Sequence, residues 1–388
     1  MKKTSWVAAV VASFLLLSLT ACDALLGGTK TKSGSSSSSS NTNVDDEITE
    51  NITTSVTWDG KDSAGNSLTY YINKELYIKD GGHLTITEGA IVKFGPNGMF
   101  NVGTTGAITA TGTKFTSYKD SDGRKISAAP DANPAMGDWK QIAIKGGTGK
   151  FTSCKFYYGG KGEISTVAVS NSTGKARVDQ CEFRYCDGTH ATRNDIRAAL
   201  RYTDEVTYNA ETNCVTNSVF KNNKWPLAMP AYFTLDNSNT FGTTAEDKND
   251  YNYVHINSIY VKISASWAKQ DVPYLYASAN NEININQGGN LTIQGSEDPD
   301  DPTVVCFASY GMLIKAGGVL KVPGYVTFRN SPESESTPFK GIFIYAGGNK
   351  KLLTENENVK MVNWQAADKF SSADNQVVVQ ETNTGTSS

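Results

Sequence analysis

The chain has 388 residues, of which 19% are charged, and its formal net charge is −3 at pH 7. It carries 36 Lys and Arg residues against 39 Asp and Glu residues, so it lacks the basic excess of a nucleic-acid-binding protein, and we expect no nucleic acid among its partners. Gly, Asn, Ser and Thr are abundant, whereas long helical periodicity is almost absent. This composition favours an all-β protein.

The N-terminal segment has the features of a secretory signal. Met1–Lys3 is basic, and Val7–Leu19 is mostly apolar but too short to span a bilayer. The sequence LTAC at Leu19–Cys22 resembles the lipobox of bacterial lipoproteins. That resemblance implies cleavage before Cys22, diacylglycerol on its thiol and acylation of its amine, for example by palmitate. We therefore interpret residues 1–21 as a lipoprotein signal peptide, in preference to an ordinary signal peptide with an incidental cysteine.

A flexible linker is expected at residues 22–48. It contains the serine run Ser35–Ser40 and few apolar groups, so it cannot bury a core. A flexible chain of about 20 residues spans roughly 25 Å, which would hold the folded part away from the lipid. The membrane is thus the first expected partner, and we favour the outer membrane or cell surface of a bacterium as the location. Asp23 favours inner-membrane retention in some Gram-negative bacteria, so the choice of leaflet stays open.

One phrase occurs twice in the folded region. GGHLTITEGAIVKF begins at Gly81, and GGNLTIQGSEDPDDPTVVCF begins at Gly288. Each contains short alternating apolar positions broken by Gly-containing corners. Beyond this phrase, Trp139–Ile144 aligns with Phe339–Ile344, followed in both copies by Gly-Gly. The alignment predicts that one architecture is repeated along a continuous chain.

The period of these strands predicts a parallel β-helix. Each strand is too short to be stable alone, but stacked on a copy of itself at about 4.8 Å it hydrogen-bonds to both neighbours. A β-sandwich would need longer strands and Asn-Gly hairpins, and a propeller would need a period of about 40 to 50 residues. We expect this parallel β-helix over residues 49–370, with a C-terminal cap and polar tail over 371–388.

Three segments carry a resemblance to a known class. GGHLTITEGAIVKFG, GAITATGTKFTSYKDSDG and GDWKQIAI resemble secreted bacterial proteins of the right-handed β-helix class, which includes the pectate-lyase-like proteins. The resemblance covers roughly Trp58 to Trp364. It implies a single right-handed parallel β-helix, and it says little about activity because this class contains lyases, adhesins and many uncharacterised surface proteins.

The middle of the chain predicts the core. The pairs Cys154-Phe156, Cys181-Phe183 and Ser218-Phe220 superimpose, and residues two apart face the same side of a strand. We expect one interior column of phenylalanines beside one column of small residues. A disulfide between stacked Cys154 and Cys181 is geometrically conceivable, but buried thiols are preferred.

Three further cysteines follow in the chain. Pairing of Cys186 with Cys214 is left open. Cys306 aligns with Lys93, a polar residue, so we expect it to face outward. Five cysteines remain beside Cys22, so at least one of them is unpaired.

Two acidic loops are candidates for a cation or ligand site. Asp120 and Asp122 have oxygen ligands at i and i+2, the start of a Ca²⁺ loop, but the distal Glu of such loops is missing. The second loop carries Glu297, Asp298, Asp300 and Asp301 between prolines. We interpret both as solvated surface loops and consider Ca²⁺ as a possible cofactor at either one. We assign no catalytic residue and no metal ligand.

Two functions are therefore considered. The first is a lipid-anchored, monomeric envelope protein that is not an enzyme and serves adhesion, binding of a host or envelope protein, or envelope architecture. The second is a β-helix protein that binds or degrades a polysaccharide, as a lyase or hydrolase. Convergence of three or more Asp, Glu, Lys or Arg residues in a groove along one sheet would favour the second.

Overall fold

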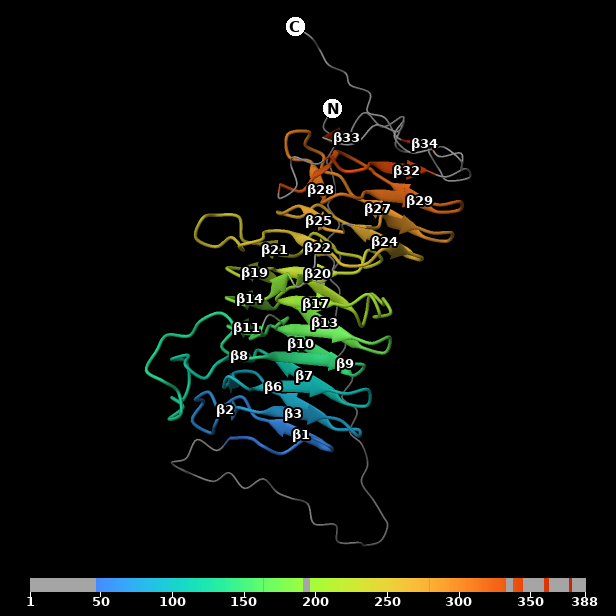
Figure 1. Ribbon diagram of the computed structural model, residues 1–388. Helices are drawn as coiled ribbons and strands as arrows, with labels where there is room; N and C mark the ends of the chain where they lie inside the picture. Colours follow the sequence, from blue (N-terminus) through green and yellow to red (C-terminus); the bar gives the residue numbers. More distant parts are fainter. Residues whose placement is uncertain are drawn as a thin grey trace, which may run out of the picture. The chain divides into compact units, whose positions relative to one another are not determined.

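Figure 1 shows the computed structural model, which describes residues 47–162, 164–190, 196–278, 280–332, 338–344, 359–362 and 377–378. Contacts divide the chain into Met1–Val44 and Asp45–Ser388, and every strand below belongs to the second unit. Within the described ranges the regular elements are short β-strands, and no α-helix is present. The expected all-β class is confirmed.

Two parallel sheets belong to the N-terminal part of this unit. Sheet I contains β1 (Ser55–Trp58), β4 (His83–Ile86), β7 (Ala107–Thr111), β10 (Thr148–Thr152), β13 (Lys175–Asp179) and β18 (Cys214–Thr216). Sheet II contains β2 (Thr69–Ile72), β5 (Ile91–Phe94), β8 (Lys114–Ser117), β11 (Lys155–Tyr157), β14 (Glu182–Arg184), β19 (Val219–Lys221) and β21 (Thr240–Phe241).

Sheet III continues through the whole unit. It contains β3 (Glu75–Ile78), β6 (Met99–Val102), β9 (Gln141–Lys145), β12 (Val167–Ser170), β17 (Leu200–Tyr202), β20 (Leu227–Met229), β22 (Val254–Ile256), β25 (Tyr274–Tyr276), β28 (Thr303–Phe307), β31 (Val326–Asn330) and β33 (Val359–Val362). The chain passes through sheets I, II and III in turn, so β1 pairs with β4 and β4 with β7. This order lets each short strand bond to a strand on either side.

Two more sheets accompany the C-terminal part of sheet III. Sheet IV contains β24 (Ser264–Trp267), β27 (Asn290–Ile293) and β30 (Val319–Lys321). Sheet V contains β23 (Tyr260–Val261), β26 (Ile283–Ile285), β29 (Met312–Ile314), β32 (Ile342–Ile344) and β34 (Val377–Val378). The strands of both sheets pair in parallel, except that β34 pairs antiparallel with β32. A small antiparallel hairpin joins β15 (Thr189–His190) to β16 (Ile196–Arg197).

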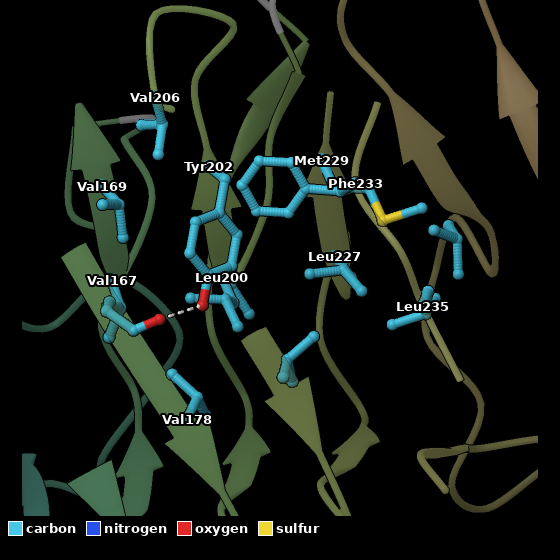
Figure 2. Close-up of a cluster of buried hydrophobic side chains, with 14 of the residues drawn as sticks. Val167, Val169, Val178, Leu200, Tyr202, Val206, Leu227, Met229, Phe233 and Leu235 are labelled. Carbon is cyan, nitrogen blue, oxygen red and sulfur yellow. Dashed lines mark hydrogen bonds between the residues drawn. The ribbon is translucent and has the colours of Figure 1, made fainter. Parts of the chain in front are cut away.

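Alternate residues of each strand fill the interior and form columns. Val167, Leu200 and Leu227 are in register on neighbouring strands of sheet III and are fully buried (Figure 2). Beside them the Tyr202 hydroxyl donates to the carbonyl oxygens of Ala176 at 2.8 Å and Cys214 at 3.0 Å, both on sheet I. A buried hydroxyl must find such partners, and here it links two sheets across the core.

The predicted phenylalanine column is confirmed. Phe156, Phe183 and Phe220 are in register on sheet II and fully buried, with ring centroids 4.6 and 5.0 Å apart. The column extends to Phe115 below and Phe241 above, at 5.1 and 5.3 Å. Because the rings repeat at the strand spacing, each one stacks on the next, and a stacked pair contributes about 0.5–1.5 kcal/mol beyond its buried area.

The small-residue column is also confirmed. Cys154, Cys181 and Ser218 are buried beside the phenylalanines, and both thiols are free. The Cys154 thiol donates to the Ala110 carbonyl at 3.4 Å, and the Cys181 thiol donates to the Phe151 carbonyl at 3.5 Å. Cys186 and Cys214 are free as well, so the pairing left open for them is not formed.

The repeated phrase occupies different sheets in its two copies. In the first copy, LTI lies on β4 of sheet I, and the next strand, β5, lies in sheet II. In the second copy, LTI lies on β27 of sheet IV, and the next strand, β28, lies in sheet III. The strand after LTI therefore lies in sheet II in the first copy but in sheet III in the second copy. Its pattern encodes a short strand and a corner, and every face needs both, so the pattern alone does not fix the face.

The expectation that Cys306 faces outward is confirmed. Val305 and Phe307 join the main core, so Cys306 lies on the outer side of sheet III. It is nevertheless fully buried, in a second cluster with Leu275, Ala277 and Ala308. Lys93, the polar residue that suggested an exposed position, is itself fully buried on the outer side of sheet II.

Candidate functional site

The outer face of sheet II carries a groove across β11, β14 and β19. Because Phe156, Phe183 and Phe220 point inward, the residues on either side of each one point outward. Five of these outward residues, namely Lys155, Glu182, Arg184, Val219 and Lys221, line a hollow of about 390 Å³. The rest of the lining is Ser153, Gln180 and Thr240, together with Cys154 and Cys181, which are almost fully buried and belong to the interior column.

The groove has three basic residues and one acidic residue. Lys155 lies on β11, Arg184 on β14 and Lys221 on β19, so each of three adjacent strands supplies one cation. Arg184 and Lys221 are in direct register. Lys155 is in register with Glu182 instead, so it lies two residues along the strand direction from the Arg184–Lys221 row, on a strand about 4.8 Å from β14. Four charged residues therefore converge along one sheet.

Glu182 lies at the centre of the groove and is already bonded. Its carboxylate accepts a hydrogen bond from the Tyr157 hydroxyl at 2.7 Å and one from the Arg184 guanidinium. Burial, together with this bond to Glu182, raises the pKa of Tyr157 well above its usual range, so the hydroxyl stays protonated. The Lys114 ammonium lies 5.1 Å from the centre of the Tyr157 ring and stacks on its face.

The basic residues differ in how they are paired. Lys221 forms an ion pair with Asp247 at 2.7 Å. Lys155 is exposed and has no ion-pair partner within 4.0 Å in the described part of the chain. Lys155 is thus a cation available to a ligand, while Arg184 keeps guanidinium donors beyond the Nε that bonds Glu182.

Two rows of corner residues flank β11, β14 and β19. The first row is Ser153, Gln180 and Asn217, with φ angles of 54°, 55° and 50°. The second row is Tyr158, Tyr185 and Asn222, with φ angles of 65°, 54° and 54°. Each row lies at one end of β11, β14 and β19, where the chain turns into or out of sheet II. Of these corner residues, Ser153 and Gln180 line the hollow, so its edge on that side is polar.

The sequence reasoning missed this groove. A signal was present in the segments KFY, EFR and VFK, where outward residues flank each inward phenylalanine. Taken alone, each of these segments has the pattern of an ordinary strand with one solvent-facing side. The cations come together only when the three strands are stacked in register.

The first acidic loop is closed by lysines. The Asp120 carboxylate accepts hydrogen bonds from Thr116 at 2.6 Å and forms an ion pair with Lys114 at 2.7 Å, and Lys114 also pairs with Asp122 at 2.6 Å. Burial acts to raise the pKa of Asp120, but the bonds from Lys114 and Thr116 outweigh it and hold that pKa below its usual range. Asp120 and Asp122 are therefore brought together, but with an ammonium between them.

A buried lysine occupies the centre of the same loop. The Lys93 ammonium donates to the backbone carbonyls of Asp120 at 2.7 Å and Arg124 at 2.8 Å. Burial lowers the pKa of Lys93, while nearby Asp120 opposes that shift. The loop thus folds over the outer side of β5 and wraps a side-chain cation. Calcium at this loop stays an untested prediction.

The second acidic loop is exposed, as expected. Glu297, Asp298, Asp300 and Asp301 lie between β27 and β28. The Asp298 carboxylate accepts from the Asp300 amide at 2.9 Å, and Asp301 pairs with Lys269 at 3.1 Å. Among the residues that the structure describes, no three His, Cys, Asp or Glu side chains are placed to hold a metal ion.

Neutralising the second loop should leave the fold unchanged. We expect Glu297→Gln, Asp298→Asn, Asp300→Asn and Asp301→Asn together to keep the wild-type melting temperature, because an exposed ion pair contributes only about 0–1 kcal/mol. Millimolar Ca²⁺ should alter neither protein. Melting curves with and without Ca²⁺ test this. A calcium-dependent rise in wild type alone would assign the loop as a cation site by mass action.

Comparison with known proteins gives no relative: no family model, no curated protein and no solved structure matches the chain. In the ranges that the structure describes, no helix is long and apolar enough to cross a membrane. Cys22, the expected lipidation site, lies outside those ranges. Function is therefore inferred from the groove and from the N-terminal motif.

Proposed function

We propose that the chain is a lipid-anchored protein of the bacterial cell envelope, built as one right-handed parallel β-helix, which binds an acidic glycan along the groove of sheet II. The helix is supported by strands that visit three sheets in turn and pair in parallel with the strand of the next turn. Parallel crossovers are right-handed in nearly all proteins. Sheets I and II accompany the N-terminal part of sheet III, and sheets IV and V accompany its C-terminal part. Because sheet III is continuous, we propose that both parts belong to one solenoid whose cross-section changes along its length.

The anchor is supported by the sequence. LTAC at the end of an apolar run supplies the cysteine for lipid attachment, and the serine-rich segment after it supplies a flexible tether. The membrane is then the first partner, through the lipid alone. We favour the outer membrane or cell surface, where a monomer on a tether of roughly 25 Å would reach external polymers.

The single observation that carries glycan binding is the ladder of Lys155, Arg184 and Lys221. A polymer laid along the strand stack would meet one cation at each strand, and an acidic group repeated along the polymer would bond to each. Arg184 suits a carboxylate because its planar guanidinium donates two parallel hydrogen bonds. A partner protein with an acidic surface would need a broad complementary face, whereas a hollow of about 390 Å³ fits a single extended chain.

Binding without catalysis is favoured by the state of Glu182. Glycoside hydrolases use a pair of carboxylates, whereas the lining of the hollow, in the described part of the chain, supplies Glu182 alone, which already accepts hydrogen bonds from Tyr157 and Arg184. Its negative charge instead orders the Arg184 side chain. The groove is then a recognition surface, and degradation of the polymer is not proposed.

Replacing the three basic residues of the groove should strongly weaken glycan binding. We expect the purified protein to bind polygalacturonate, and Lys155→Gln, Arg184→Gln and Lys221→Gln together to weaken binding at least about 100-fold, since each hydrogen bond to a charged group contributes about 1.5–3 kcal/mol. Titration calorimetry measures this. The control is Lys61→Gln, Lys74→Gln and Lys79→Gln, which removes the same charge from exposed positions elsewhere. Equal weakening in the control would mean that net charge, rather than the groove, attracts the polymer.

A further inference from the structure

The Arg184 side chain is held by a neighbouring tyrosine through a shared carboxylate. Arg184 on β14 is in direct register with Tyr157 on β11 and with Lys221 on β19. Its guanidinium Nε donates to Oε1 of Glu182, which lies two residues earlier on the same face of the strand. The Tyr157 hydroxyl donates to Oε2 of the same carboxylate at 2.7 Å. Because each oxygen of Glu182 has its own donor, the carboxylate cannot turn without breaking one of these two bonds.

Tyr157 is itself fixed in place by the loop that follows β8. The Lys114 ammonium lies over the Tyr157 ring, 5.1 Å from its centre. The same ammonium forms ion pairs with Asp120 at 2.7 Å and with Asp122 at 2.6 Å, and Asp120 is buried. A continuous series of contacts therefore runs from this loop through Tyr157 to the Arg184 guanidinium. Tyr157 does not line the hollow, so any role in binding must pass through a residue that does.

We infer that Tyr157 is a positioning residue for the glycan site, which acts through Glu182 to hold the Arg184 guanidinium ready for a carboxylate of the ligand. This inference rests on the proposed function and adds to it the origin of the site's order. Because Nε of Arg184 is bonded to Glu182, its two Nη groups remain to donate parallel hydrogen bonds to a carboxylate. A side chain that is already ordered loses less conformational freedom when the ligand binds, so it binds the ligand more tightly.

The test removes the Tyr157 hydroxyl with and without Arg184. Tyr157→Phe keeps the ring that Lys114 contacts and loses only the hydrogen bond to the carboxylate. We expect its affinity for polygalacturonate to fall about three- to tenfold, the effect of ordering one free side chain on binding. In an Arg184→Gln protein, which still has Lys155 and Lys221 to bind the polymer, Tyr157→Phe should have no further effect. Titration calorimetry of the four proteins of this double-mutant cycle measures the coupling.

The outcomes separate the positioning role from the proposed function. The control is Tyr158→Phe, at the next tyrosine, whose ring stacks on Tyr185, and it should bind as wild type does. If Tyr157→Phe binds as wild type does, or loses the same affinity with and without Arg184, the positioning role is wrong and the groove stands. If wild type does not bind polygalacturonate, both proposals fail. A lower melting temperature of Tyr157→Phe would not obscure the result, because the cycle subtracts any loss that is common to both backgrounds.

Discussion

Replacing Phe183 by alanine should lower the free energy of unfolding by about 3–5 kcal/mol, as truncation of a buried aromatic does. Phe183 is fully buried between Phe156 and Phe220, with near-parallel rings at interplanar angles of 14° and 7°. The loss removes both ring contacts and leaves a cavity that the strand stack cannot close, because the hydrogen bonds of β14 fix the strand spacing. Denaturant unfolding followed by circular dichroism measures it.

The matched controls use the same position and an outward neighbour. Phe183→Asp should be worse than alanine, since it buries an unpaired carboxylate. Val219→Ala, at an outward and only partly buried position of the neighbouring strand, should cost much less. A Phe183→Ala protein that melts within about one degree of wild type would contradict the interior column, because a loss of this size moves the melting temperature by several degrees.

The second large effect concerns Cys22. We expect Cys22→Ala to abolish lipid attachment completely, because the other five cysteines, which the structure describes, follow no apolar signal and four of them are buried. Labelling of cells with an alkyne analogue of palmitate, followed by capture of the protein, measures attachment. Ser18→Ala, just before the LTAC motif, is the control and should keep the label. Persistent labelling of Cys22→Ala would show that the lipobox interpretation is wrong.

The interior residues could be predicted because their positions follow from the sequence of each strand alone. Alternation within a strand identifies inward residues, and Phe156, Phe183 and Phe220 each sit in an unmistakable short strand. The sheet that each copy of the repeat would occupy was not predictable, since LTI on β4 and on β27 has the same pattern but belongs to different sheets. The sequence of a short alternating strand does not specify which sheet the strand will join.

Burial on the outer faces also escaped the sequence. Lys93 is covered by its own downstream loop, whose carbonyl groups bind the ammonium, and alternation predicts direction but not what lies above a side chain. The groove escaped for a related reason. Lys155 and Arg184 are 29 residues apart in the sequence, and Arg184 and Lys221 are 37 residues apart. Whether these side chains lie close together depends on how β11, β14 and β19 pair, and this register is known only from the structure.

The most direct test of the account is a structure of the full-length mature protein with a polygalacturonate oligomer. We expect an extended chain along the outer face of sheet II, with its carboxylates at Lys155, Arg184 and Lys221. An oligomer bound at any other face, or a protein that shows no oligomer at saturating concentration, would contradict it.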